Sequence, residues 1–287
     1  MYIRQLTSWG AIFTPGAHGV LEENGIPLST ISAVLLGHSH LDHIGNLAKF
    51  PNSTSLVVGP GSLMGEELAQ DMDVPLSVLQ SRTVRQLSRT EDKWVTVGCL
   101  EGVDYFGDGS LWLLDTPGVS NLKPDRLNTV EFNIDSWLDP KHKRGHMSAL
   151  VCTSTDPPAY HLLASDTCHH CCLLHSTENP RPRAGLFTPD KYDPAFKSDK
   201  LTSMHEDLEE AYRSMAKVGR MDLEDNINVL LAHDMTVDLI YPPGLHFIRI
   251  DGGMDELQRL KRRDRTAWKD FLEKEKDAAP VKPTVHK

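Results

Sequence analysis

The sequence lacks a long apolar run, an excess of basic residues and a regular cysteine framework, and each absence excludes a class of protein. No stretch is apolar enough to span a membrane, and residues 1–13 lack the basic start and apolar core of a signal peptide. A formal net charge of −10 argues against a nucleic-acid-binding face. Five irregularly spaced cysteines indicate reduced thiols. We therefore expect a cytoplasmic protein without a nucleic-acid or membrane partner.

Strand patterns and helix patterns alternate along the chain, as in an α/β protein. Apolar, β-branched runs bounded by glycine, proline or polar residues predict strands at 31–37, 54–61, 111–118, 148–154, 159–166 and 227–234. Apolar residues at helical spacing, with capping and stop signals, predict helices at 20–25, 202–218 and 254–274. There is no repeat and no linker. The sequence predicts a single domain over residues 1–275 and a disordered tail at 276–287.

The segment LLGHSHLDHIGN, residues 35–46, places three histidines and an aspartate directly after a predicted buried strand. His38 and His40 are two positions apart and can hold one cation, whereas Asp42 and His43 are adjacent and can turn toward a second. Imidazole nitrogen and carboxylate oxygen suit Zn²⁺ or a similar metal. A solvated polar turn is the alternative interpretation. The density of ligand groups at a strand end favours a metal site.

The HSHLDH motif resembles the H-x-H-x-D-H signature of the metallo-β-lactamase superfamily. The resemblance covers residues 20–250 and implies a four-layer αβ/βα sandwich with one or two metal ions along the sheet edges. It assigns Asp166, in LLASD, as the carboxylate shared by two ions, and His233, in VLLAHD, as the last histidine ligand. The family's first strands and its D-x-G turn are not found before His38. We therefore expect the sandwich to be truncated at its amino-terminal end.

The third motif of the family, T-P-G-H-x-x-G-H, is divided in this sequence. Val119 follows TPG directly, and the GH pair appears only at residues 145 and 146. Counting back four places from His146 assigns His142 as the third ligand of the first metal, with His146 as the next candidate. Residues 119–141 then form either a loop at the rim of the site or translated intron sequence. The competing interpretation of His142 is an exposed basic run, KHKR.

The segment CHHCC, residues 168–172, has the spacing of half a zinc knuckle. A second cysteine pair that would complete a structural zinc site is missing. His169 follows the predicted shared carboxylate by three residues. In related lactonases a tyrosine at this place steadies the substrate, so His169 could donate a proton or a hydrogen bond there. An exposed or packed histidine is the alternative.

The resemblance is to fungal lactamase-like hydrolases in particular, through FGDGSLWLLDTPG and GHMSALVCTS. It implies two Zn²⁺ ions whose bound hydroxide opens small lactam or lactone rings, with detoxification of plant defence compounds as one role. Asp42 would bind the second metal and also act in catalysis by orienting the nucleophile or moving its proton. The expected ligands are His38, His40, Asp42, His43, His142, Asp166 and His233.

Three other functions use the same ligands or the same fold. A thioesterase would act on acyl groups carried by a carrier protein in secondary metabolism. An oxygenase would hold a single iron ion. An inactive, truncated homologue would bind metal poorly. For the hydrolase, the expected partner is a small acyl substrate, and the sequence does not determine the oligomeric state.

Overall fold

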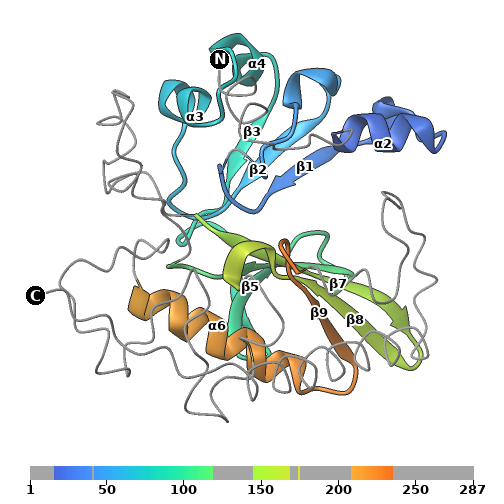
Figure 1. Cartoon of the computed structure of the whole chain (residues 1–287), viewed down its shortest axis with the longest axis vertical. Coiled ribbons are helices and arrows are strands. Elements are labelled where there is room, and N and C mark those ends of the chain that lie inside the picture. The colour runs from blue at the N-terminus through green and yellow to red at the C-terminus, as the bar shows by residue number, and fades with distance from the viewer. Residues whose placement is uncertain (1–15, 41, 119–144, 169–173, 175–207, 235–287) are drawn as a thin grey trace, which may run out of the picture.

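The computed structural model describes residues 16–40, 42–118, 145–168, 174 and 208–234 (Figure 1). The predicted helix at 254–274, the segment 119–141 and the tail at 276–287 lie outside these residues, so the structure does not test those predictions or the single-domain boundary. Among the described residues, no helix is both long enough and apolar enough to cross a membrane.

The first sheet has three parallel strands in the order β1-β2-β3. Their bounds are Ala33–Leu36 for β1, Ser55–Val58 for β2 and Val84–Gln86 for β3. Helices α2 (Ala17–Glu23), α3 (Gly65–Asp71) and α4 (Leu76–Gln80) and the short turns η1 (Leu28–Thr30) and η2 (Leu47–Lys49) accompany it. Leu56 and Val58 are almost fully buried against Leu68 and Leu79 of α3 and α4. This burial explains why the apolar run in the sequence becomes a central strand.

The second sheet has six strands in the order β4-β5-β6-β7-β8-β9. Their bounds are Trp94–Val97, Leu100–Asp104, Leu111–Asp115, Met147–Thr155, Pro158–Leu163 and Ile227–Leu230. Neighbouring strands from β4 to β8 are antiparallel, and β8 pairs with β9 in parallel. The turn η5 (Ser165–Thr167) follows β8, and helix α6 (Leu208–Asp222) precedes β9. This chain path brings the carboxyl ends of β6, β8 and β9 to the same edge of the sheet.

Three apolar cores separate four layers (Figure 1). Alternation along β6 shows how one strand serves two of them: Leu113 faces the core between the sheets, and Leu114 faces the core under α6. Helices α3 and α4 cover the outer face of the first sheet, and α6 covers the outer face of the second. The predicted four-layer αβ/βα sandwich is therefore confirmed.

The predicted elements that fall in the described residues are found, with shifted ends. The strand predicted at 54–61 ends at Val58, and the one predicted at 111–118 ends at Asp115. In both cases the residues beyond the strand contact the segment that begins at Gly145. Gly59 packs on Gly145, and the backbone N–H of Thr116 donates to the carbonyl of His146. The helix predicted at 202–218 continues to Asp222, because Met221 belongs to the core under α6.

Candidate metal centre

The loops that carry the predicted ligands meet where the carboxyl ends of the strands converge. The backbone N–H of Met147, which begins β7, donates to the carbonyl of Gly37, which follows β1, over 2.8 Å. The N–H of Ala232 beyond β9 donates to the carbonyl of Ser165 beyond β8 over 3.0 Å. The first bond links the two sheets, and the second links the segments that follow β8 and β9. Backbone hydrogen bonds therefore help to hold the loops of the site together.

Three glycines allow the loops to approach each other closely. A side chain on Gly37 would begin 2.7 Å from the hydroxyl oxygen of Ser165, and one on Gly59 would collide with the carbonyl of Gly145. Gly145 itself has a φ of +104°, a conformation that favours glycine. Glycine at these positions lets the loops of the first sheet touch the loops that carry His146 and Asp166.

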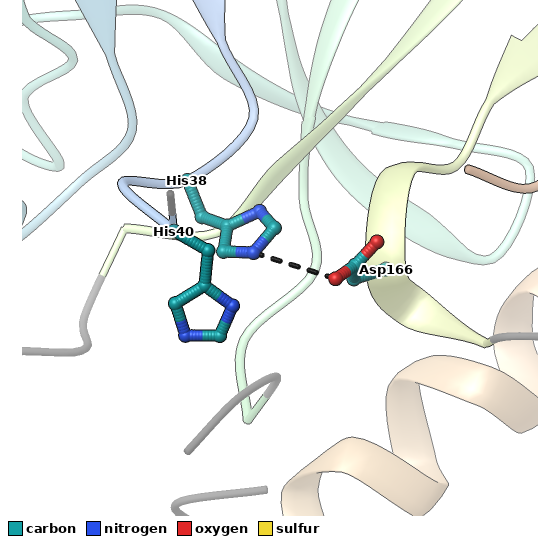
Figure 2. A group of neighbouring side chains, drawn as sticks. All are labelled: His38, His40 and Asp166. Carbon is teal, nitrogen blue, oxygen red and sulfur yellow. Dashed lines mark ion pairs between the residues drawn. The ribbon is translucent and has the colours of Figure 1, made fainter. Parts of the chain in front are cut away.

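The first group of ligand-type side chains is His38, His40 and Asp166 (Figure 2). One ligand atom from each lies within 4.8 Å of the others. Nε2 of His38 is 3.5 Å from Oδ2 of Asp166, and the rings of His38 and His40 have centroids 4.4 Å apart. Figure 2 shows both histidines on the loop after β1, with the carboxylate of Asp166 facing His38 from the turn after β8.

The second group is Asp42, His43 and His233, again with one ligand atom from each within 4.8 Å of the others. Nε2 of His233 is 3.2 Å from Oδ2 of Asp42. The other carboxylate oxygen of Asp166, Oδ1, lies 3.1 Å from Nε2 of His43 and 3.3 Å from Nε2 of His233. Asp166 therefore offers one oxygen to each group, which is the geometry of a shared carboxylate.

Burial and crowding keep His38 and His146 in their neutral form. Burial, together with the neighbouring rings of His146, His40 and His43, lowers the pKa of His38 to about 2. Burial likewise lowers the pKa of His146 to about 3. A neutral imidazole has a lone pair to offer, whereas a protonated one does not. These rings are thus in the protonation state that a metal ligand requires.

The carboxylates are stabilised as anions. The hydrogen bond from His233 lowers the pKa of Asp42 to about 2. Burial raises the pKa of Asp166, but hydrogen bonds from His233 and His43 outweigh it and hold that pKa far below its usual range. The same contacts, to Asp166 first and then to Asp42, raise the pKa of His233 to about 10. Without a cation between these carboxylates, the proton on His233 supplies the positive charge.

The donor set fits a cation better than a network of hydrogen bonds. Both ring nitrogens of His38 and Nε2 of His146 are buried and have no hydrogen-bond partner among the described residues. Buried polar atoms in native proteins are nearly always satisfied, so such atoms gathered in one place indicate a missing partner. Nitrogen donors facing a shared carboxylate suit Zn²⁺ or a similar metal.

One more histidine, His146, lies next to the first group. It is 2% exposed, and its ring centroid lies 5.1 Å from that of His38. Its Nδ1 atom lies 2.7 Å from the hydroxyl of Thr116 and 3.0 Å from the carbonyl of the same residue. His142, which the motif spacing ranks first, lies outside the described residues, as does His169. Both assignments stay predictions.

Comparison with known proteins agrees with this geometry. A family model described as the metallo-beta-lactamase superfamily matches residues 7–149. That range contains the H-x-H-x-D-H motif and the strands β1 to β6, and the described fold has the layers that the family requires. The chain belongs to the metallo-β-lactamase superfamily.

The curated relatives are fungal proteins. The chain is 29% identical to the gamma-lactamase FDB1 of Fusarium pseudograminearum over 80% of this chain and 56% of that protein. It is 31% identical to the metallo-hydrolase mfmC of Annulohypoxylon moriforme over 78% of this chain and 60% of that protein. The chain thus spans less than two thirds of the length of these relatives.

A solved structure of an N-acyl homoserine lactone hydrolase, with the product N-hexanoyl-L-homoserine bound at its catalytic metal center, is also similar. The identity is 17%, the TM-score is 0.42, and the match covers 77% of this chain and 63% of that one.

Proposed function

We propose that the chain is a zinc-dependent hydrolase that opens small lactam or lactone rings. The observation that carries the proposal is the position of Asp166, whose two carboxylate oxygens face two separate groups of ligand-type side chains. A carboxylate shared in this way suits a pair of cations a few ångströms apart. Membership of the metallo-β-lactamase superfamily and similarity to fungal relatives support the hydrolase class.

The two groups would hold one Zn²⁺ each. His38, His40 and Asp166 would bind the first ion, with His142 or His146 adding a nitrogen, and Asp42, His43, His233 and Asp166 would bind the second. Zinc bound there would supply an activated water as the nucleophile and would polarise the carbonyl of the substrate. The protein's part is to keep His38 and His146 neutral and the carboxylates ionised, which the burial and hydrogen bonds of the site already favour.

Asp42 is the side chain best placed for proton transfer in this proposal. Its side chain is 56% exposed, whereas that of Asp166 is 5% exposed. An ionised carboxylate at the open side of the site can accept a hydrogen bond from the attacking water, orient it, and pass its proton to the leaving nitrogen or oxygen. Asp166, buried between the groups, serves as the structural bridge. His169 would assist the leaving group.

We infer the substrate class from the name of one relative and from the charge of the chain. The gamma-lactamase FDB1 is named for opening a lactam, and an acidic protein suits a neutral or weakly charged acyl compound better than a polyanion. Detoxification of a plant-derived lactam is the role we infer. The cytoplasm is the compartment we propose, because Cys99, Cys152 and Cys168 are free thiols.

The test is metal content measured together with a substrate panel. Purified protein should contain two zinc ions per chain and should hydrolyse a γ-lactam or γ-lactone, and Asp166→Asn should abolish both properties. Hydrolysis of acyl thioesters alone would support the thioesterase alternative. A single iron ion with oxygen consumption would support the oxygenase. Metal-free, inactive protein would indicate an inactive homologue.

A further inference from the structure

A chain of buried hydroxyl groups runs behind the first group of ligands. Nδ1 of His146 lies 2.7 Å from Oγ1 of Thr116, which lies 3.0 Å from Oγ of Ser148. Ser148 in turn lies 3.4 Å from Oγ1 of Thr167, whose hydroxyl donates to the carbonyl of Ala164 over 2.7 Å. All three hydroxyl-bearing residues are at most 2% exposed. The chain therefore exchanges no hydrogen bonds with bulk solvent.

The direction of each hydrogen bond in this chain is determined. The carbonyl of Ala164 can only accept, so Thr167 uses its one hydroxyl proton there and must accept from Ser148. Ser148 has then used its proton and must accept from Thr116. By the same step Thr116 has no proton left for His146, so Nδ1 of His146 must be the donor.

A second contact shows independently that Nδ1 of His146 carries the proton. Nδ1 of His146 also lies 3.0 Å from the carbonyl oxygen of Thr116, an atom that only accepts. A neutral imidazole with its proton on Nδ1 carries its lone pair on Nε2. Nε2 of His146 is buried without a hydrogen-bond partner among the described residues, on a ring 5.1 Å from that of His38. The hydroxyl chain thus leaves a nitrogen donor unused beside the first group.

The other end of the chain reaches the shared carboxylate. Thr167 follows Asp166 in the turn η5, and its hydroxyl bond to Ala164 closes that turn. Ser148 therefore connects Thr116, which contacts His146, to the turn that carries Asp166. The hydroxyl of Ser148 contacts neither His146 nor Asp166. Loss of the Ser148 hydroxyl would leave Thr116 without its acceptor and Thr167 without its donor, inside a buried site.

We propose that Thr116 and Ser148 are positioning residues for metal binding: their hydroxyl chain fixes His146 as an Nε2 donor to the first zinc position and sets its place relative to Asp166. This inference rests on the proposed function only in requiring that zinc binds. It names His146 as a ligand whether or not His142 also reaches the metal. Partners behind a metal-binding histidine typically change affinity by about 10- to 100-fold.

The decisive comparison uses two equally buried threonines whose hydroxyl groups each make a hydrogen bond. Thr54 is as buried as Thr116, and its hydroxyl donates to the carbonyl of Ile31 over 2.8 Å, but it precedes β2 at the opposite end of the first sheet. Thr116→Val and Thr54→Val therefore remove one buried hydroxyl each. Zinc affinity is measured by competition with a chelator on the full chain, and thermal melting reports folding.

We expect Thr116→Val and Ser148→Ala to weaken the first zinc by about 10- to 100-fold, whereas Thr54→Val keeps wild-type affinity and Thr116→Ser restores it. The Co²⁺-substituted protein should show a changed visible spectrum in Thr116→Val and Ser148→Ala but not in Thr54→Val. Equal zinc affinities for Thr116→Val and Thr54→Val would overturn the proposal.

Nitrogen NMR of the zinc-free protein gives a second readout that needs no activity. His146 should carry its proton on Nδ1, and a proton found on Nε2 would overturn the proposal. A wild-type chain that binds no zinc would overturn both this inference and the proposed function. A chain that binds two zinc ions with these affinities but hydrolyses no ring would overturn the function alone.

Discussion

Oδ1 of Asp166 lies 3.1 Å from Nε2 of His43, while the other oxygen of the same carboxylate faces His38. Asp166→Asn keeps the size of the side chain but replaces one oxygen by an NH₂ group, which cannot bind a cation. We expect the variant to hold at most one zinc ion and to lose more activity than the roughly 10- to 100-fold typical of supporting residues. Zinc content and hydrolysis rate measure both effects. A variant with two ions and a near-normal rate would contradict the shared-carboxylate assignment.

A second prediction concerns His142 and His146, the two candidates for the third histidine ligand of the first zinc. His146→Ala removes a buried nitrogen whose ring lies 5.1 Å from that of His38, so we expect the first zinc to be lost. His142→Ala is the matched variant, and the motif spacing assigns the larger loss to it. Two bound ions in His146→Ala, with loss of zinc in His142→Ala, would show that His142 and not His146 is the ligand, as the motif spacing predicts.

Zinc binding should release a proton from His233. The hydrogen bonds to Asp166 and Asp42 raise the pKa of His233 to about 10, so this ring is protonated at pH 8 without metal, and a metal ligand must be neutral. Zinc titrations by calorimetry at pH 8, in buffers of different ionisation enthalpy, measure the protons released. We expect His233→Ala to release about one proton fewer than wild type. Equal release by the two proteins would show that His233 is not the group that deprotonates.

The zinc-free protein should lose stability as pH falls from about 6.5 to 4. The pKa values of His38 and His146 are lowered to about 2 and about 3, so the unfolded chain binds more protons than the folded one in this window. The free energy of unfolding then rises with pH, by up to about 1.4 kcal/mol per pH unit for each group. His233 is protonated in both states there, and Asp42 and Asp166 are mainly ionised in both.

Urea unfolding of chelator-treated protein across that range measures the slope. His146→Gln removes one of the two titrating groups and should make the dependence shallower. A slope that is unchanged in His146→Gln would mean that His146 is not buried in its neutral form.

The parts of the site that the sequence could predict are those carried by dense local motifs. His38, His40, Asp42 and His43 share one loop, and Asp166 and His233 each follow a strand with a clear apolar pattern. Because these strands end at the same edges of the two sheets, the structure brings all six side chains together. The predicted strands were found for the same reason, since buried β-branched runs leave a strong periodic signal.

Features that depend on pairing between distant segments could not be predicted. Thr116 and Ser148 approach each other only because Leu114 pairs with Ser148 and Asp115 with Met147 in the β6–β7 register. The sequence prediction omits strands β3, β4 and β5, because their sequences VRQ, WVTV and LEGVD do not form long apolar runs. The spacing of the motif ranks His142 before His146, and it carries no information about the hydroxyl groups behind the ring of His146.

The central claim is that two zinc ions lie on either side of Asp166, and anomalous diffraction at the zinc edge from crystals of the full chain tests it most directly. We predict two peaks, one next to His38 and His40 and the other next to His43 and His233, each within coordination distance of a different oxygen of Asp166. A single peak, or two peaks of which neither contacts Asp166, would contradict the account.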